Sequence, residues 1–273
     1  MRPERADIAA PELPLRTRWL EGSPGSMAGL TATGPVLVHF FDFAQLYSVR
    51  ALPYVVAWHE RYRDAGLTVL GIHSPRFPFT ADPGALSTAV ERLGIAHPVA
   101  ADSDYAIWHD YGARGWPSLF LWGAGGALRW FQFGEGEYAA TEGAIQDELR
   151  GLNALVELPE PLAPLRPTDA PGALVAAPTE EAFPGGSPAQ PWRAGEAAPE
   201  LHVDYAAGGA YAALAGSGSV VVSLDDCPAR ELAVDAPGLY ELAAHERHEE
   251  HTLAVGPGPG IDVYALSFAA GMP

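Results

Sequence analysis

The sequence contains one cysteine, Cys227, and no lysine among its 273 residues. A single cysteine excludes an intrachain disulfide. The absence of lysine excludes a Schiff-base lysine and the lysine of a phosphate-binding P-loop. Cys227 stands in the stretch DDCPAR, where the negative charge of two aspartates disfavours the nucleophilic thiolate. We therefore expect no redox role for this residue.

Long apolar runs are also absent. No run approaches the roughly 20 residues that span a bilayer. The opening stretch MRPERADIAAPELPLRTRW lacks the apolar core of a secretory signal. These features predict a cytoplasmic location. The net charge of −18 repels phosphate backbones and anionic lipid, so we expect neither nucleic acid nor membrane insertion. A protein, peptide or small-molecule partner stays open.

Composition divides the chain into four parts. Residues 1–14 form an N-terminal extension, and residues 15–155 alternate between strand and helix patterns. Residues 156–199 are rich in Pro, Ala and Gly and predict a linker, in which residues 173–175 and Trp192 are candidates to pack against a domain. Residues 200–273 show short strand patterns separated by Gly/Pro turns. We expect two domains joined by an extended segment.

The first domain shows the periodicities of an α/β fold. Residues 36–41 are continuously apolar, as in a buried parallel strand. Val49, Leu52, Val56 and Tyr62 recur at near-helical spacing, and Gly66 ends that helix. Further elements are predicted at 67–73 (strand), 86–93 and 102–111 (helices), 119–122 and 128–133 (a hairpin) and 137–155 (helix). This order predicts a mixed central sheet with helices on both faces.

The last part predicts an all-β domain. Candidate strands are 200–206, 210–215, 219–224, 230–235, 238–243, 251–255 and 261–268. Strands this short and this regularly spaced are typical of a β-sandwich, including the jelly-roll type.

Several segments resemble one family. The stretch VLVHFFDFAQLYSVRALPYVVAWHERYRDAGLTVLGIHSPRF and the later HPVAADSDYAIWHDYGARGWPSLFLW resemble the thioredoxin-like domain of the TlpA/DipZ group. GLYELAAHERHEEHTLAV and IDVYALSFAAG resemble the carbohydrate-binding-module-like β domain that follows it in DipZ proteins. The resemblance implies a thioredoxin-like α/β domain followed by a β-sandwich domain.

The resemblance breaks at the reactive positions. The two cysteines of the family's CxxC motif fall on Gln45 and Ser48, while Pro117 matches the family's cis-proline. Arg76 stands where many relatives have an acidic residue. Because thiol exchange needs a thiolate, neither an amide nor an unactivated hydroxyl can replace it. We expect no catalytic dithiol and no cofactor.

The surface around the lost cysteines is the predicted ligand-binding groove. Gln45, Tyr47, Ser48, Trp116 and Pro117 would form it. The N-terminus of the following helix offers free N–H groups, and the backbone beside a cis-proline can pair with an extended peptide. The leading interpretation is a redox-inactive binding or scaffolding protein.

Three alternatives stay open. His39, Asp42 and Ser48, with Tyr47, could form a rebuilt non-thiol active site, because they are the residue types of a nucleophile, base and orienting group. His245, His248 and His251 could bind a metal if their segment were helical. However, that segment is predicted to be a loop between strands, so no metal is expected. Exposed tyrosines among Tyr205, Tyr211, Tyr240 and Tyr264 would indicate carbohydrate binding.

Overall fold

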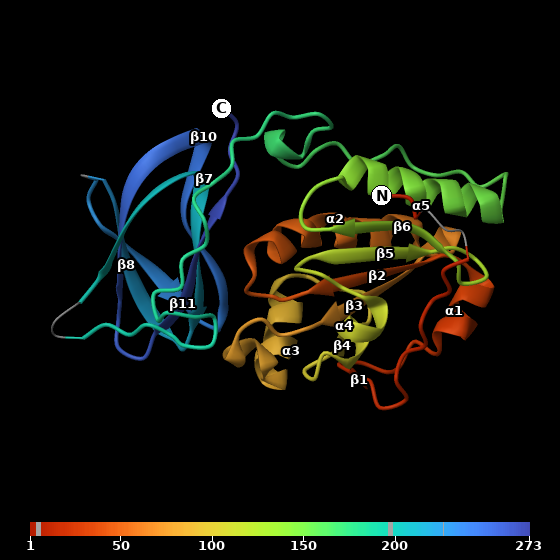
Figure 1. Cartoon of the computed structure of the whole chain (residues 1–273), viewed down its shortest axis with the longest axis horizontal. Coiled ribbons are helices and arrows are strands. Elements are labelled where there is room, and N and C mark those ends of the chain that lie inside the picture. The colour runs from red at the N-terminus through yellow and green to blue at the C-terminus, as the bar shows by residue number, and fades with distance from the viewer. Residues whose placement is uncertain (4–6, 196–198, 226) are drawn as a thin grey trace.

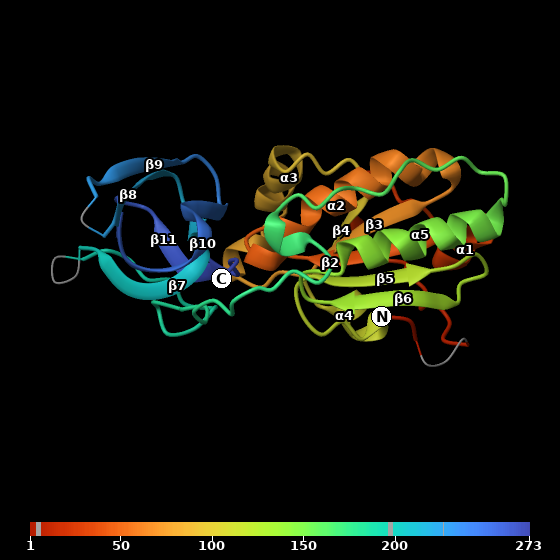
Figure 2. The same cartoon turned by 90° about the horizontal axis from the view of Figure 1, so that it is seen from above.

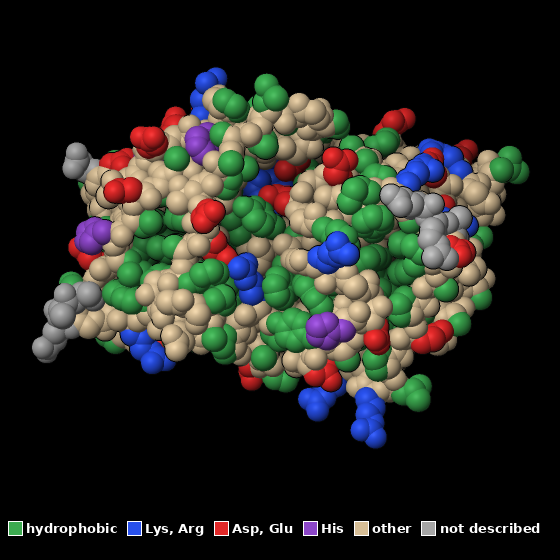
Figure 3. Space-filling view, viewed as in Figure 1, with side chains coloured by type: hydrophobic (Ala, Val, Ile, Leu, Met, Phe, Trp, Pro, Cys, Tyr) green, Lys and Arg blue, Asp and Glu red, His purple; other side chains and the backbone are tan. Residues whose placement is uncertain are grey.

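The computed structural model describes residues 1–3, 7–195, 199–225 and 227–273. They form two bodies joined by a long segment that runs over both, as Figure 1 shows. Acidic side chains are scattered over both bodies on the face shown in Figure 3, as the net charge of −18 suggests. Of the helices in the described ranges, none is long and apolar enough to cross a membrane.

The first body is a mixed sheet covered by helices. Its elements are β1 (Arg18–Trp19), α1 (Met27–Thr33), β2 (Val36–Phe41), α2 (Leu46–Tyr62), η1 (Arg63–Ala65), β3 (Thr68–His73), η2 (Pro78–Ala81), α3 (Pro83–Arg92), β4 (Val99–Ala101), α4 (Ala106–Tyr111), β5 (Ser118–Trp122), β6 (Leu128–Phe133) and α5 (Tyr138–Leu152). The strand order is β1-β4-β3-β2-β5-β6. Strands β2, β3 and β4 run parallel, and β1, β5 and β6 are antiparallel to their neighbours.

Burial follows the sequence pattern in this sheet. All six residues of β2 are buried, because helices cover both faces of the strand. Helices α2 and α5 pack on one face, and α1 and α4 pack on the other. Gly66 follows the short helix η1 with a φ of 108°, a left-handed conformation that favours glycine. The expected thioredoxin-like α/β fold is confirmed.

The second body is one antiparallel sheet. Its strands are β7 (Leu201–Ala215), β8 (Gly218–Leu224), β9 (Arg230–Val234), β10 (Gly238–Pro257) and β11 (Asp262–Ala269). They lie in the order β11-β7-β10-β8-β9, and Figure 2 shows that the sheet curls. Its strands enclose an apolar core. The all-β class is confirmed.

The number of strands differs from the expectation. The pairs predicted at 200–206 and 210–215, and at 238–243 and 251–255, are continuous in β7 and β10. The register between these two strands shifts after Ala244, so that residues 245–248 stand opposite Gly208 alone. A bulge of this kind lets a strand bend without ending. The histidine-rich run is therefore part of a strand and not the predicted loop.

The segment between α5 and β7 packs along both bodies. Leu158 and Leu162 contact the apolar face of the first body. Ala182 and Trp192 form bridges with β11 and pack on the core of the second. Trp192 thus packs as predicted, whereas Leu174 of the 173–175 patch is 77% exposed and does not. The only regular element within residues 153–195 is the turn-like helix η3 (Pro167–Asp169).

The two bodies share an apolar cluster. Phe77, Leu86 and other residues of the first body belong to the same buried cluster as Ala213 and Tyr264 of the second. The ring centroids of Phe79 and Tyr264 lie 4.8 Å apart. Since such contacts exclude water on both sides, they fix the β domain against the thioredoxin-like domain.

Candidate functional site

Gln45 and Ser48 use their side chains to hold the start of α2. Gln45 is the N-cap residue, and its Oε1 accepts a hydrogen bond of 2.8 Å from the backbone N–H of Ser48. The Ser48 Oγ accepts a bond of 3.2 Å from the N–H of Asp42. Gln45 is 4% exposed and Ser48 is fully buried. These two positions therefore serve helix capping and loop geometry, and they offer no nucleophile at the surface.

Asp42 is a buried hub that organises the loop after β3. Its Oδ1 accepts from the N–H of Ala44 at 2.7 Å. Its Oδ2 accepts from the N–H of Arg76 at 2.7 Å and from the hydroxyl of Thr80 at 2.5 Å. The Nε2 of His73 lies 3.8 Å from the same oxygen. Burial lowers the pKa of His73 to about 4, although the charge of Asp42 acts in the opposite direction.

His39 lies apart from the other members of the suggested triad. No hydrogen bond among the described residues joins it to Asp42 or Ser48, and neither ring nitrogen has a partner there. The ring stacks on Phe41 with centroids 5.3 Å apart. Burial, followed by the nearby His97, lowers the pKa of His39 to about 3. The arrangement gives Ser48 no general base.

The Trp116–Pro117 peptide bond is cis and leads into β5. The indole Nε1 of Trp116 donates to the carbonyl of Ser74 at 2.7 Å, and its ring packs against Trp108. The guanidinium of Arg76 lies 5.8 Å from the centre of the Trp116 ring. Arg76 thus covers the surface between Trp116 and the start of α2.

The predicted groove is covered by the chain itself. Arg76 forms an ion pair with Glu181 of the connecting segment. Glu181 in turn accepts a hydrogen bond of 2.8 Å from Ser267 of β11. The Tyr47 hydroxyl donates to the carbonyl of Phe268 at 3.4 Å. Beside the start of α2 lies a cleft of about 370 Å³, lined by Gln45, Leu46, Tyr47, Arg76, Pro178, Thr179, Glu180, Glu181, Ser267 and Phe268. Of the predicted groove residues, Gln45 and Tyr47 line this cleft, whereas Ser48, Trp116 and Pro117 do not.

The tyrosines of the β domain do not form an exposed platform. Tyr205 is 3% exposed and Tyr264 is 7% exposed, and both pack in apolar clusters. Tyr211 and Tyr240 are half-buried. Tyr211 donates to Glu241, and Tyr240 donates to the carbonyl of Ala236. Stacking on a sugar ring needs an exposed aromatic face, and none of these four residues is fully exposed.

Histidines of β10 form the one cluster with metal-binding potential within the described residues. His245 and His251 come together with Glu249, whereas His248 is outside the group. Two of the three histidines singled out in the sequence thus meet. Sequence spacing did not identify Glu249, because the bulge that precedes it could not be foreseen. Cys227 is exposed on the loop after β8, in the domain that does not contain α2.

Glu181 and Ser267 are among the residues of the cleft that sequence reasoning missed. They are separated by 86 positions, and Glu181 lies 105 positions from Arg76. Glu181 stands in a segment without periodicity, so no pattern in the sequence marks it. The one sequence signal for this ion pair is Arg76, because an arginine stands where many members of the resembling family have an acidic residue.

Comparisons with known proteins agree with this geometry. No protein-family model matches the chain. It is 29% identical over 303 aligned positions to the protein DipZ of Mycobacterium tuberculosis. This alignment covers 95% of this chain and 42% of DipZ. It is 30% identical over 124 residues to the thiol-disulfide oxidoreductase YkuV of Bacillus subtilis, covering 45% of this chain and 82% of YkuV. The chain spans less than half the length of the DipZ proteins that it matches.

Solved structures are similar to about half of this chain. The solution structure of a thioredoxin-like protein in the oxidized form matches 52% of this chain and 95% of its own. The two share 27% sequence identity with a TM-score of 0.47.

Proposed function

Because the chain belongs to the TlpA/DipZ-like group of thioredoxin-fold proteins, we propose that it acts without redox chemistry, as a binding and scaffolding protein. Its thioredoxin-like domain is the rigid platform. The platform holds the connecting segment and the β domain across the surface where relatives of this fold carry the CxxC motif.

The proposal depends on the hydrogen bonds that the side chains of Gln45 and Ser48 make with the backbone. Both side chains bond backbone N–H groups and are buried. A dithiol protein must present a thiolate at this helix N-terminus, where the partial positive charge stabilises it. Here an amide and a hydroxyl take the helix and loop hydrogen bonds instead. The two residues therefore stabilise the fold, and no thiol at positions 45 and 48 is available to transfer electrons.

Coverage of the groove supports a scaffolding role. Glu181 joins Arg76 of the platform to Ser267 of β11, and Tyr264 packs on Phe79. The remaining cleft of about 370 Å³ is of the size that takes a small molecule and not a folded partner. We assign external binding to this cleft or to the outer surface of the β domain.

The test restores the lost thiols and then uncovers them. The variant Gln45→Cys/Ser48→Cys should form an intramolecular disulfide with a small oxidant such as oxidised glutathione. With dithiothreitol as reductant, it should reduce insulin slowly, because the β domain blocks a protein substrate. Adding Glu181→Ala and Tyr264→Ala should speed insulin reduction at least tenfold. The rate with oxidised glutathione should change little.

The control adds Glu231→Ala, an exposed residue of β9 away from the cleft, to the restored variant. It should leave the insulin rate unchanged. Failure of the two cysteines to form a disulfide would show that positions 45 and 48 are not the former dithiol positions. Equal insulin rates with and without the uncovering substitutions would show that the groove is open, and would overturn the scaffolding role.

A further inference from the structure

The bulge of β10 brings three potential metal ligands together. His245, Glu249 and His251 each offer one donor atom, and these atoms lie within 4.8 Å of one another. In a regular strand, residues 245, 249 and 251 would lie on one face of the sheet, spread along the strand at about 3.3 Å per residue. The register shift opposite Gly208 removes that separation. His248 is not part of this group. Its backbone N–H donates to the carbonyl of Met272 at 2.7 Å.

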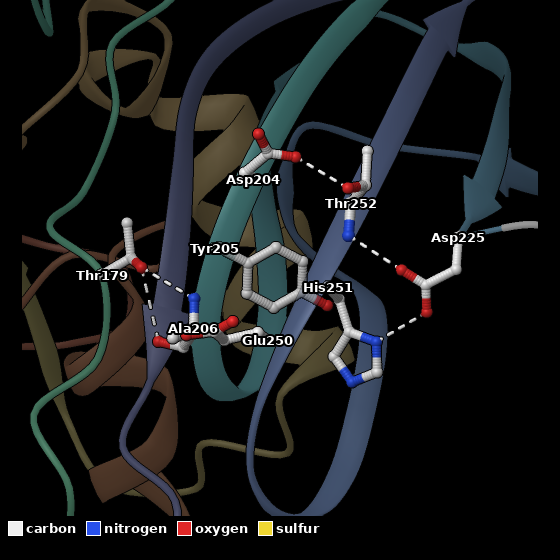
Figure 4. A pocket seen from close by; sticks show the side chains of 8 residues that line it. All are labelled: Thr179, Asp204, Tyr205, Ala206, Asp225, Glu250, His251 and Thr252. Atoms are coloured by element: carbon white, nitrogen blue, oxygen red, sulfur yellow. Dashed lines mark hydrogen bonds and ion pairs between the residues drawn. The ribbon is translucent and has the colours of Figure 1, made fainter.

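His251 is supported in the way that metal-binding histidines usually are. Its Nδ1 lies 2.8 Å from Asp225 Oδ2, a contact drawn in Figure 4. A carboxylate bonded to one ring nitrogen fixes the tautomer and directs the other nitrogen to the metal. Asp225 is itself held, because its Oδ1 accepts from the N–H of Thr252 at 2.9 Å.

The other nitrogen of His251 faces a second carboxylate. Nε2 lies 3.4 Å from Glu249 Oε2. When Nδ1 carries the proton that Asp225 accepts, the Nε2 lone pair and the Glu249 carboxylate repel each other. A cation between them, either a proton or a metal ion, removes that repulsion.

His245 completes the group. Its ring lies parallel to that of His251, with centroids 4.0 Å apart, and its Nε2 lies 2.7 Å from the Tyr205 hydroxyl. Burial and the neighbouring His251 both lower the pKa of His245.

We propose that His245, Glu249 and His251 bind one divalent transition-metal ion, with Zn²⁺ as the best match. Two imidazole nitrogens and one carboxylate oxygen are a known ligand set of zinc sites that keep an open position. Ligand atoms around a tetrahedral zinc lie about 3.3 Å apart. Donor atoms already within 4.8 Å can reach that spacing by side-chain rotation. Ca²⁺ and Mg²⁺ fit less well, because they require mostly oxygen ligands.

The open coordination position of the proposed metal ion would face a cleft beside His251. His251 borders an open cleft of about 520 Å³, whose other lining residues are Thr179, Asp204, Tyr205, Ala206, Asp225, Glu250 and Thr252 (Figure 4). Water, or an oxygen-donor ligand entering this cleft, would take the fourth coordination position. The three proposed ligands all lie in β10. Thr179 of the connecting segment lines both this cleft and the cleft beside Gln45.

Titration of Zn²⁺ into the full chain by isothermal calorimetry tests the proposal. The protein carries no affinity tag, and it carries Cys227→Ala, so that the exposed thiol binds no metal. One ion should bind per chain. His245→Ala and His251→Ala should each weaken binding at least tenfold, and Asp225→Asn should weaken it about tenfold through its support of His251. His248→Ala is the matched control and should bind as the parent does.

A second readout separates loss of the site from loss of the fold. Circular dichroism should give the same spectrum for each variant and the parent. In the parent, the ring-proton resonances of two histidines should shift on adding Zn²⁺, and the thermal midpoint should rise. The proposal is overturned if the parent binds no Zn²⁺, if His251→Ala binds with parental affinity, or if His248→Ala loses as much as His245→Ala does.

Discussion

At the scale of single residues, the amide of Gln45 and the hydroxyl of Ser48 decide what the former reactive site can do. Each accepts one backbone hydrogen bond at the point where β2 passes into α2. Neither has a neighbouring base that would make it a nucleophile. Both side chains contribute to the stability of the fold, and the free energy of unfolding measures that contribution.

We expect Gln45→Ala to lower the free energy of unfolding by about 1 kcal/mol, because an N-cap acceptor is lost. Ser48→Ala should cost about 1–3 kcal/mol, since the buried N–H of Asp42 loses its partner. Urea denaturation measures both values. Ser87→Ala, an exposed residue of α3, is the control and should cost less than 0.5 kcal/mol. Costs as small as that of the control would contradict the capping role.

Buried histidines predict a loss of stability in acid. Burial lowers the pKa of His39 and of His97 to about 3 and that of His73 to about 4, against about 6.5 in an unfolded chain. Between about pH 6.5 and pH 4 the unfolded state binds more protons than the folded state does. The free energy of unfolding should therefore fall with falling pH, by up to about 1.4 kcal/mol per pH unit for each histidine.

His39→Leu isolates one of these contributions. At pH 8 the variant should be about as stable as the parent, because the His39 ring nitrogens have no partners among the described residues. Its stability should fall less steeply below pH 6.5. Denaturant titrations at several pH values measure the slope. An unchanged slope would mean that His39 takes up its proton in the folded state as easily as in the unfolded one.

Sequence reasoning identified the two degenerate positions but not the role of Asp42. The positions could be found because a strand, a turn and a helix N-terminus follow one another locally. Asp42 holds Arg76 and Thr80, which lie 34 and 38 residues further along the chain. Contacts of that kind depend on tertiary packing and leave no periodicity. For the same reason the triad of His39, Asp42 and Ser48 was compatible with the sequence but is not assembled.

At the scale of elements, the connecting segment acts as a strap. The side chains of Arg76 and Glu181 are 20% and 19% exposed, so their ion pair is mostly shielded from solvent. Glu181 also accepts from Ser267. The strap therefore couples the loop after β3 to β11.

A double-mutant cycle with Arg76→Gln and Glu181→Gln measures this coupling. We expect an interaction energy of about 1 kcal/mol or more, because the pair is partly desolvated and shares hydrogen bonds. The same cycle on the exposed pair Arg2 and Asp147, whose side chains are 74% and 58% exposed, should give less than 1 kcal/mol. If the interaction energy of Arg76 and Glu181 is no larger than that of the exposed pair, the connecting segment does not couple the loop after β3 to β11 through this ion pair.

Elements of the first domain were more predictable than those of the second. The apolar run of β2 and the helical spacing of α2 are local patterns, and both were recovered from sequence. In the β domain, turn residues suggested breaks near residues 208 and 245, where β7 and β10 bend and continue. A bulge depends on the partner strand, so a single sequence cannot tell it from a turn. For that reason the meeting of His245, Glu249 and His251 could not be predicted from the sequence.

At the scale of the whole molecule, the β domain and the thioredoxin-like domain form one unit. They share a buried cluster, and the segment between them adds bridges to β11. The domain order could be predicted from sequence. Closure of the β domain over the former active-site groove could not, because it depends on residues such as Tyr264 and Glu181 that lie far from α2 in the chain.

The most direct test of the account is a disulfide-reduction assay on the unmodified chain. Insulin and dithiothreitol supply the substrate and the reductant, and the Cys227→Ala variant is measured beside the parent. Both proteins should leave the rate at that of dithiothreitol alone, because neither Gln45 nor Ser48 can carry electrons. Acceleration that persists in Cys227→Ala would show dithiol-like turnover without a thiol, and would contradict the account.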